Sequence, residues 1–171
     1  MSGLITSDLD GTHLHGISMT QQERLEELRT ALRHTGIDGG LKVLNDGIAH
    51  RYTALYRLHD SMLKNVGLFD KAGEVRAEYL AVVPLESSFC QFVLRDGFFA
   101  SSDTGEDRRL DGHVYQGKLM AYHGVPVRDR HGELFGTLCH FDMLRRDISQ
   151  ENFELMQQAA VAFAPLLEQQ P

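Results

Sequence analysis

Two apolar runs near the C-terminus constrain the fold of this chain more than any other feature. Residues 119–128 and 133–142 are rich in apolar, β-branched and aromatic side chains, and the connection Asp129-Arg130-His131-Gly132 separates them. Asp and Gly in a short connection favour a tight reversal between antiparallel strands. The sequence therefore predicts a β-hairpin here, in a sheet that contains antiparallel neighbours.

Further strands are expected in the middle of the chain. Apolar residues alternate from Tyr52 to Leu58, which is the period of a strand. Extended stretches at about 62–69 and 75–83 flank Asp70-Lys71-Ala72-Gly73, a second candidate for a tight turn. A short strand is expected at about 98–101. The sheet is thus predicted to be built from hairpins.

Helices are predicted on both sides of these strands. Thr20 and Glu23 fit a capping box, and leucines at helical spacing follow up to Gly36. A second short helix is expected from Ile37 to Ile48, and another within Glu86–Leu94.

The C-terminal segment has the strongest helical pattern in the chain. Ser149 is the expected cap, and two apolar stripes follow it, one containing Phe163 and Leu167 and the other containing Ala159 and Leu166. Because only one stripe can face the sheet, we expect the other to contact a partner helix, which makes the chain a homodimer through its terminal helices. The alternative is a single broad core face.

Composition bounds the class of protein. With 171 residues and 42% hydrophobic content, the chain has the size of one domain, which we place at 19–171 after a poorly ordered tail at 1–18. The net charge of -7 and the lack of a basic run argue against nucleic-acid or membrane partners. Two cysteines and no apolar stretch of transmembrane length favour a cytoplasmic protein.

The N-terminal stretch LITSDLDGT resembles the opening motif of haloacid-dehalogenase-type phosphatases, a resemblance that would make Asp8 the phosphoryl acceptor and Asp10 the proton carrier. Enzymes of that type need a parallel sheet built from βαβ units, whereas the strands expected here form hairpins. The later acidic pair of those phosphatases is also absent. We interpret the match as accidental and expect no catalytic residue and no metal site.

A longer series of motifs resembles a GAF domain of the bacterial sensor-type branch. The segments PLESSFCQFVLRDGFFASSD, EDRRLDGH and AYHGVPVRDRHGELFGTLCHFDMLRR precede a long terminal helix, and the resemblance covers about residues 37–168. It implies an α+β fold with a central antiparallel sheet of about six strands. It also implies terminal helices on one face and a ligand pocket on the other, under the loop and short helices of residues 86–118.

The resemblance implies a domain that senses an unidentified small molecule or relays a signal, without catalysis of its own. One alternative is a thiol-dependent reductase of the free methionine sulfoxide type, although those proteins use a cysteine in the loop that here reads SDTGEDRRLDGH. Bilin-binding relatives attach their chromophore through a cysteine before a histidine, and Gly112 precedes His113 here. The other alternative is a degenerate GAF domain that serves only for dimerisation. No cofactor is identified.

Seven polar residues form the candidate ligand site. An arginine can pair bidentately with a carboxylate or phosphate, and a histidine can donate or accept near neutral pH. The opposing interpretation is that such residues brace the loop or belong to the strand. His140 and Asp142 are instead expected to be strand-end and surface groups. The candidate site comprises Asp103, Asp107, Arg108, Arg109, His113, Tyr122 and His123.

Cys90 is the candidate redox residue. It follows Phe89 on an expected short helix, and a thiol becomes reactive when its pKa is lowered. Cysteines among phenylalanines are more often packing residues, and Cys139, inside an expected central strand, fits that role more strongly. We therefore expect apolar burial to keep both thiols unreactive.

Overall fold

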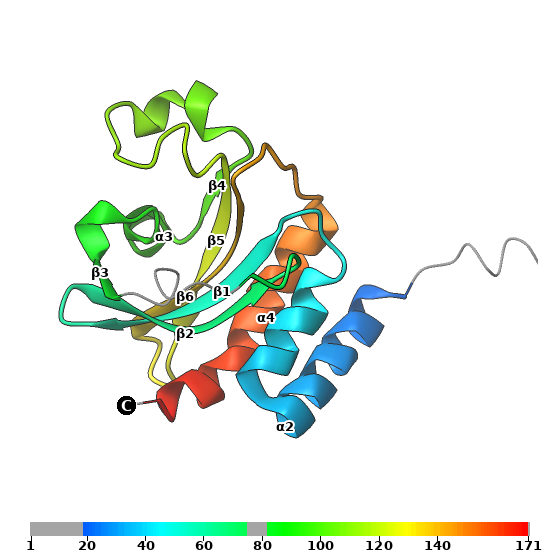
Figure 1. Cartoon of the computed structure of the whole chain (residues 1–171). Coiled ribbons are helices and arrows are strands. Elements are labelled where there is room, and N and C mark those ends of the chain that lie inside the picture. The colour runs from blue at the N-terminus through cyan, green and yellow to red at the C-terminus, as the bar shows by residue number, and fades with distance from the viewer. Residues whose placement is uncertain (1–18, 75–81, 171) are drawn as a thin grey trace, which may run out of the picture.

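The computed structural model describes residues 19–74 and 82–170. These residues form an α+β structure with an antiparallel sheet of strand order β3-β2-β1-β6-β5-β4 (Figure 1). The strands are β1 (Tyr52–His59), β2 (Met62–Asp70), β3 (Val82–Pro84), β4 (Phe99–Ser101), β5 (Ala121–Arg128) and β6 (Leu134–Asp142). The helices are α2 (Gln21–Asn45), α3 (Cys90–Asp96) and α4 (Gln150–Glu168), with short 3-10 turns η2 (Leu85–Ser87), η3 (Thr104–Glu106) and η4 (Arg108–Leu110). The expected tail at 1–18 and most of the strand expected at 75–83 lie outside the described residues.

The C-terminal hairpin forms as predicted. In its turn the Asp129 carboxylate accepts hydrogen bonds from the backbone N–H groups of His131 at 2.8 Å and Glu133 at 2.9 Å. Gly132 has a φ of 82°, a left-handed conformation that suits glycine. This turn sets the register of β5 against β6, and β6 pairs on its other side with β1.

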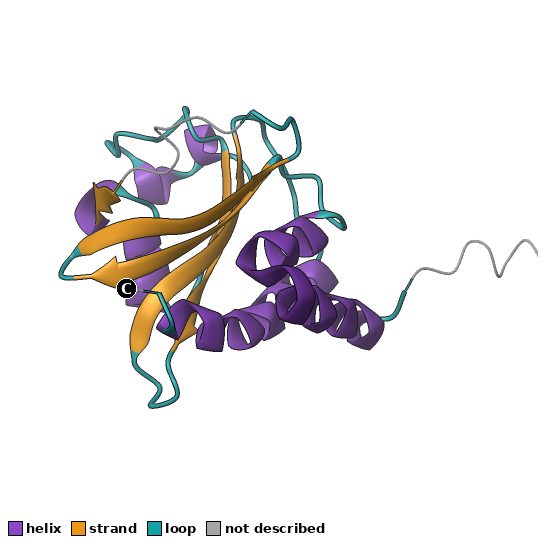
Figure 2. Cartoon of the chain, turned by 60° about the horizontal axis from the view of Figure 1, so that its bottom comes forward, coloured by secondary structure: helices purple, strands orange, loops and turns teal. Residues whose placement is uncertain are grey.

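Helices cover both faces of the sheet (Figure 2). On one face, α2 and α4 pack on an apolar core that includes Leu55 and Leu138. On the other face, α3 and the loop after β4 pack on a second core that includes Ala54 and Cys139. Neighbouring residues of one strand enter different cores because side chains alternate between the two faces of a sheet.

Helix α2 contains a sharp break at Gly36. The capping box forms as predicted, since the Thr20 hydroxyl accepts from the Glu23 N–H and the Glu23 carboxylate accepts from the Thr20 N–H. Gly36 has a φ of 73°, which interrupts the helix and folds its second half back along the first (Figure 1). A Cβ added to Gly40 would lie only 2.4 Å from Leu32 Cδ2, so the two halves pack closely.

The terminal helix α4 has a broader buried surface than expected. It packs against both the sheet and α2 of the same chain. Both predicted stripes contribute to this surface, and the second stripe therefore has a partner within the chain. The sequence argument for a partner helix from a second copy does not hold. The buried residues of α4 are Leu155, Met156, Ala159, Ala160, Phe163, Ala164 and Leu167.

Candidate functional site

A cavity of about 370 Å³ lies on the α3 face of the sheet. Its described walls come from the strands, from α3 and from the loop that precedes β5. Apolar side chains such as Leu63 and Leu119 complete these walls. The aromatic rings that line the cavity belong to Tyr56, Phe89, Tyr115, Tyr122 and Phe141. Large aromatic surfaces of this kind bind apolar parts of small molecules.

The cavity contains a small polar group around Cys90. Its sulfur lies 3.1 Å from the Tyr122 hydroxyl, and the Thr137 hydroxyl donates to it at 3.3 Å. Hydrogen bonds from the Cys139 thiol, Thr137 and Tyr122 lower the pKa of Cys90 below its usual value, although burial acts in the opposite direction. The two thiols are buried as expected, but the surroundings of Cys90 are not purely apolar.

Two residues of the predicted site brace the loop instead of lining the cavity. The Arg109 guanidinium donates to the Asp107 carboxylate at 2.6 Å and to the Ala100 carbonyl at 2.7 Å, and it stacks over the Phe99 ring. Asp107 also accepts from the Arg109 N–H and so caps η4. These contacts fix the loop to β4, which is the bracing role that the sequence left open.

The other loop residues of the predicted site are separated from one another. Arg108 is exposed, and Asp103 lies just before η3. The His113 ring packs on Phe89 at 4.6 Å between centroids, and its Nδ1 accepts from the Tyr115 N–H. Burial lowers the pKa of His113. None of Asp103, Arg108 and His113 is among the described residues that line the cavity.

Tyr122 and His123 lie on opposite faces of the sheet. Tyr122 lines the cavity, whereas His123 points into the layer under α2 and α4. Successive residues of a strand always diverge in this way, so one site on one face cannot include both. Of the seven residues predicted for the ligand site, Tyr122 alone lines this cavity, and the candidate redox residue Cys90 lies beside it.

His123 belongs to a buried cluster of three histidines that the sequence analysis missed. Its Nδ1 lies 2.9 Å from Nε2 of His50, and His140 Nδ1 lies 2.7 Å from the Thr53 hydroxyl. Burial, followed by the nearby His123, lowers the pKa of His50 to about 3. Burial also lowers the pKa of His123 to about 4 and that of His140 well below its usual value. His140 is thus a core residue and not a surface group.

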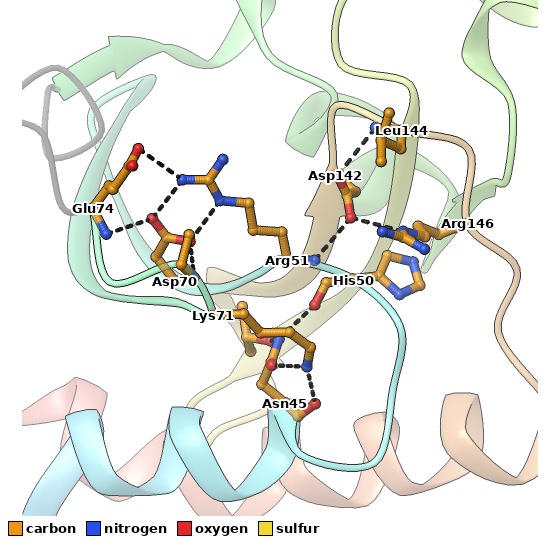
Figure 3. Close-up of polar contacts among 11 residues, drawn as sticks. Asn45, His50, Arg51, Asp70, Lys71, Glu74, Asp142, Leu144 and Arg146 are labelled. Atoms are coloured by element: carbon orange, nitrogen blue, oxygen red, sulfur yellow. Dashed lines mark hydrogen bonds and ion pairs between the residues drawn. The ribbon is translucent and has the colours of Figure 1, made fainter.

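A network of ion pairs closes the end of the sheet near this cluster (Figure 3). Arg51 binds both carboxylate oxygens of Asp70, at 2.7 and 3.0 Å. Asp142 accepts from the Arg51 N–H and from the Arg146 guanidinium. Asp142 is 2% exposed, so the expectation of a surface group was wrong. The network joins β1, β2 and β6 and has a structural role.

Within residues 19–74 and 82–170, no three His, Cys, Asp or Glu side chains are grouped so that they could hold a metal ion. No helix in the same residues is long and apolar enough to span a membrane.

Comparisons with solved structures identify the fold. The chain is similar to the GAF domain of Acinetobacter phosphoenolpyruvate-protein phosphotransferase, with a TM-score of 0.72 and 13% identity over 89% of this chain and 95% of that chain. The chain has the GAF fold. It is also similar to free methionine-R-sulfoxide reductase from Neisseria meningitidis in complex with its substrate, with a TM-score of 0.68 and 13% identity over 89% and 93% of the two chains.

A third similar GAF-fold structure is the phycoerythrobilin-bound GAF domain of a cyanobacterial phytochrome, with a TM-score of 0.68 and 14% identity over 88% and 96% of the two chains. No family model matches the sequence of this chain, and no curated protein does. The same fold therefore occurs in GAF domains of a phosphotransferase and a phytochrome and in a reductase.

Proposed function

We propose that this chain is a small-molecule-sensing GAF domain that relays a signal and has no catalytic activity of its own. The observation that carries this proposal is the cavity between the sheet and α3, with a volume of about 370 Å³ and walls that include Tyr56, Phe89 and Tyr122. A largely apolar cavity with a few polar groups is the usual form of a ligand site. A domain that served only for dimerisation would not need this space.

The walls define the chemistry of the proposed ligand. Most of the described lining residues are apolar or aromatic, and Lys118 is the one among them with a charged side chain. The Tyr122 and Cys90 side chains offer weaker polar contacts. We infer a small, mostly apolar molecule with an aromatic ring, which carries an anionic group near Lys118.

Relatives with the same fold support a binding role. The cyanobacterial GAF domain is described as bound to phycoerythrobilin, and the Neisseria reductase as bound to its substrate. The fold therefore accommodates small organic molecules in other proteins. We place the function of this chain in one domain, residues 19–171, and infer a cytoplasmic location because its two cysteines are free.

The signal relay requires a second surface, and we retain a homodimer through the terminal helices as part of the proposal. The outer face of α4 carries Val161, which is 73% exposed, beside a groove lined by Pro126 and Pro165. We assign this groove, together with Val161, as the surface that packs against a second copy.

A charge comparison tests the proposed ligand chemistry. Small aromatic carboxylates are screened by thermal shift against the wild type and against Lys118→Met and Arg108→Met. We expect Lys118→Met to weaken binding about tenfold or more, because it removes the cation at the cavity. Arg108→Met, which removes an exposed cation of the neighbouring loop, is the matched control. Loss of binding only in Arg108→Met would favour the polar loop as the ligand site.

A further inference from the structure

Two cysteine thiols face the same cavity. Cys90 comes from the start of α3, and Cys139 comes from the middle of β6. Both are free, and both line the cavity although their exposed fractions are only 4% and 0%. Thr137, which lies two residues before Cys139 on the same face of β6, donates to the Cys90 sulfur at 3.3 Å. The two sulfurs are therefore neighbours in a space that small molecules can enter.

The two thiols have different hydrogen-bond partners. Cys90 lies next to two hydroxyl groups, those of Tyr122 at 3.1 Å and Thr137 at 3.3 Å, and Thr137 donates to its sulfur. The Cys139 thiol lies 3.8 Å from the carbonyl oxygen of Ala54, so its single proton has two alternative acceptors, this oxygen and the Cys90 sulfur. Hydroxyl donors stabilise a thiolate, whereas a carbonyl acceptor stabilises the protonated thiol.

The pKa values of the two thiols are shifted in opposite directions. Hydrogen bonds from Cys139, Thr137 and Tyr122 hold the pKa of Cys90 below its usual value against the effect of burial. The hydrogen bond to Cys90, together with burial, raises the pKa of Cys139 well above its usual value. Cys90 thus ionises first, and the thiolate is the form that attacks an electrophile.

We propose that Cys90 and Cys139 form a hydroperoxide-reactive dithiol pair, in which Cys90 is the nucleophile and Cys139 the resolving thiol. The Cys90 thiolate attacks a peroxide oxygen, so an S–O bond forms, the O–O bond breaks, and hydroxide leaves and is protonated to water. The Cys139 thiol then attacks the resulting sulfenic acid. An S–S bond forms, the S–O bond breaks and a second water leaves.

The overall step is balanced. The two thiols lose two protons and two electrons, and hydrogen peroxide is reduced to two molecules of water. The disulfide would join α3 to β6 across the cavity wall, so oxidation would change the shape of the cavity. The reaction needs no other ligand, and it is therefore independent of the binding activity proposed above.

The cavity also predicts which oxidants react. Hydrogen peroxide is small enough to enter beside Tyr115 and Met143, which lie at the exposed side of the cavity. Bulky aromatic disulfide reagents react only with a sulfur that is accessible from solvent. Because Cys90 is almost fully buried, these reagents cannot reach it easily. We expect oxidation by peroxide to be faster than labelling by such reagents.

The test uses the reduced full chain and hydrogen peroxide. After treatment near neutral pH, the chain is unfolded and free thiols are alkylated, and mass spectrometry then maps the cysteines. We expect an intramolecular disulfide between Cys90 and Cys139 that a reductant reverses. Two freely alkylated thiols, under conditions that oxidise free cysteine, would contradict the proposal, and so would a disulfide between two chains.

Variants separate the roles of the two thiols. In Cys139→Ser we expect a sulfenic acid that dimedone traps at Cys90, and in Cys90→Ser we expect Cys139 to stay reduced.

Tyr122→Phe is expected to slow the reaction of Cys90 roughly tenfold, because it removes a hydrogen bond to the thiolate. Tyr52→Phe removes the phenol hydroxyl of a buried tyrosine that does not line the cavity, and it is the control. Oxidation of Cys139 at the wild-type rate in Cys90→Ser would overturn the assignment. A ligand screen on the reduced protein distinguishes failure of this proposal from failure of the binding role.

Discussion

The Nε2 atom of His50 lies 2.9 Å from the Nδ1 atom of His123, with both rings buried between the sheet and the terminal helices. One ring donates and the other accepts, so the accepting imidazole must be neutral. His140 lies beside them, with its ring centroid 5.7 Å from that of His50. If any one of these three rings gained an additional proton, it would become a cation in a buried layer, which is costly.

The free energy of unfolding is therefore expected to fall steeply in mild acid. The unfolded chain binds a proton at each histidine below about pH 6.5. In the folded chain the pKa is lowered to about 4 for His123 and to about 3 for His50, so these rings bind a proton only at a much lower pH. Because the unfolded state binds more protons, each histidine contributes a loss of about 1.4 kcal/mol per pH unit between pH 6.5 and its pKa in the folded chain. Urea unfolding at pH 7 and pH 5 measures this loss.

A pair of histidine variants isolates the effect. His123→Gln keeps a hydrogen-bonding side chain but cannot titrate. The loss in free energy of unfolding is therefore expected to decrease by the contribution of one histidine, about 1.4 kcal/mol per pH unit. His59→Gln changes a solvent-exposed histidine at the end of β1 and should leave the loss unchanged. Equal stability of the wild type at pH 7 and pH 5 would show that the buried cluster has no such role.

Close packing at Gly136 gives a second prediction. A Cβ at this position would lie 2.5 Å from Leu167 Cδ2 and 2.5 Å from the Tyr56 carbonyl oxygen. Since the carbonyl belongs to the backbone of β1, the contact cannot be relieved by a rotamer change. We expect Gly136→Ala to destabilise the chain by about 1 to 3 kcal/mol. Gly105→Ala, where the nearest atom is 3.4 Å away, is the control, and chemical denaturation compares them.

The proposed dimer gives a third prediction. Val161 is 73% exposed on the outer face of α4, whereas Phe163 is fully buried. We expect Val161→Glu to convert a dimer into a folded monomer, because it places a charge at the helix interface. Phe163→Glu should instead unfold the chain, since it buries an unpaired charge. Light scattering and circular dichroism distinguish the two results. A wild-type monomer at micromolar concentration would refute the dimer.

Much of the fold could be predicted from local sequence patterns. The turn at Asp129–Gly132, the capping box at Thr20 and the break at Gly36 each depend on residues that are neighbours in the sequence. The resemblance to GAF domains then placed helices on one face of the sheet and a cavity on the other, as the structure shows. The partner of the second stripe on α4 was missed, because periodicity identifies an apolar face but not the element that covers it.

The site was predicted less well, for a physical reason. Tyr122 lines the cavity, but charged loop residues of the predicted site satisfy one another, as in the Asp107–Arg109 pair. The alternation of β5 alone would have removed His123 from the same site. Contacts between distant elements, such as Cys90 with Thr137 or His50 with His123, leave no local signal in one sequence.

The cavity supplies a fourth prediction, which concerns its accessibility. Leu119 lines the cavity and is half-buried, and Val114 lies in the same loop but is 57% exposed. Leu119→Trp should add enough volume to obstruct the cavity, while Val114→Trp adds the same kind of ring to the solvent side. Both variants are expected to remain folded, because neither position is fully buried.

The central claim is that this cavity binds a small molecule, and a ligand-dependent thermal shift in these two variants tests it most directly. A compound that binds only the folded chain, present at about 100 times its dissociation constant, stabilises it by about 2.7 kcal/mol. That change raises the melting temperature by several degrees. We predict this shift for small aromatic carboxylates in the wild type and in Val114→Trp, and its loss in Leu119→Trp. An equal shift in all three proteins, or no shift in the wild type across a broad screen, would contradict the account.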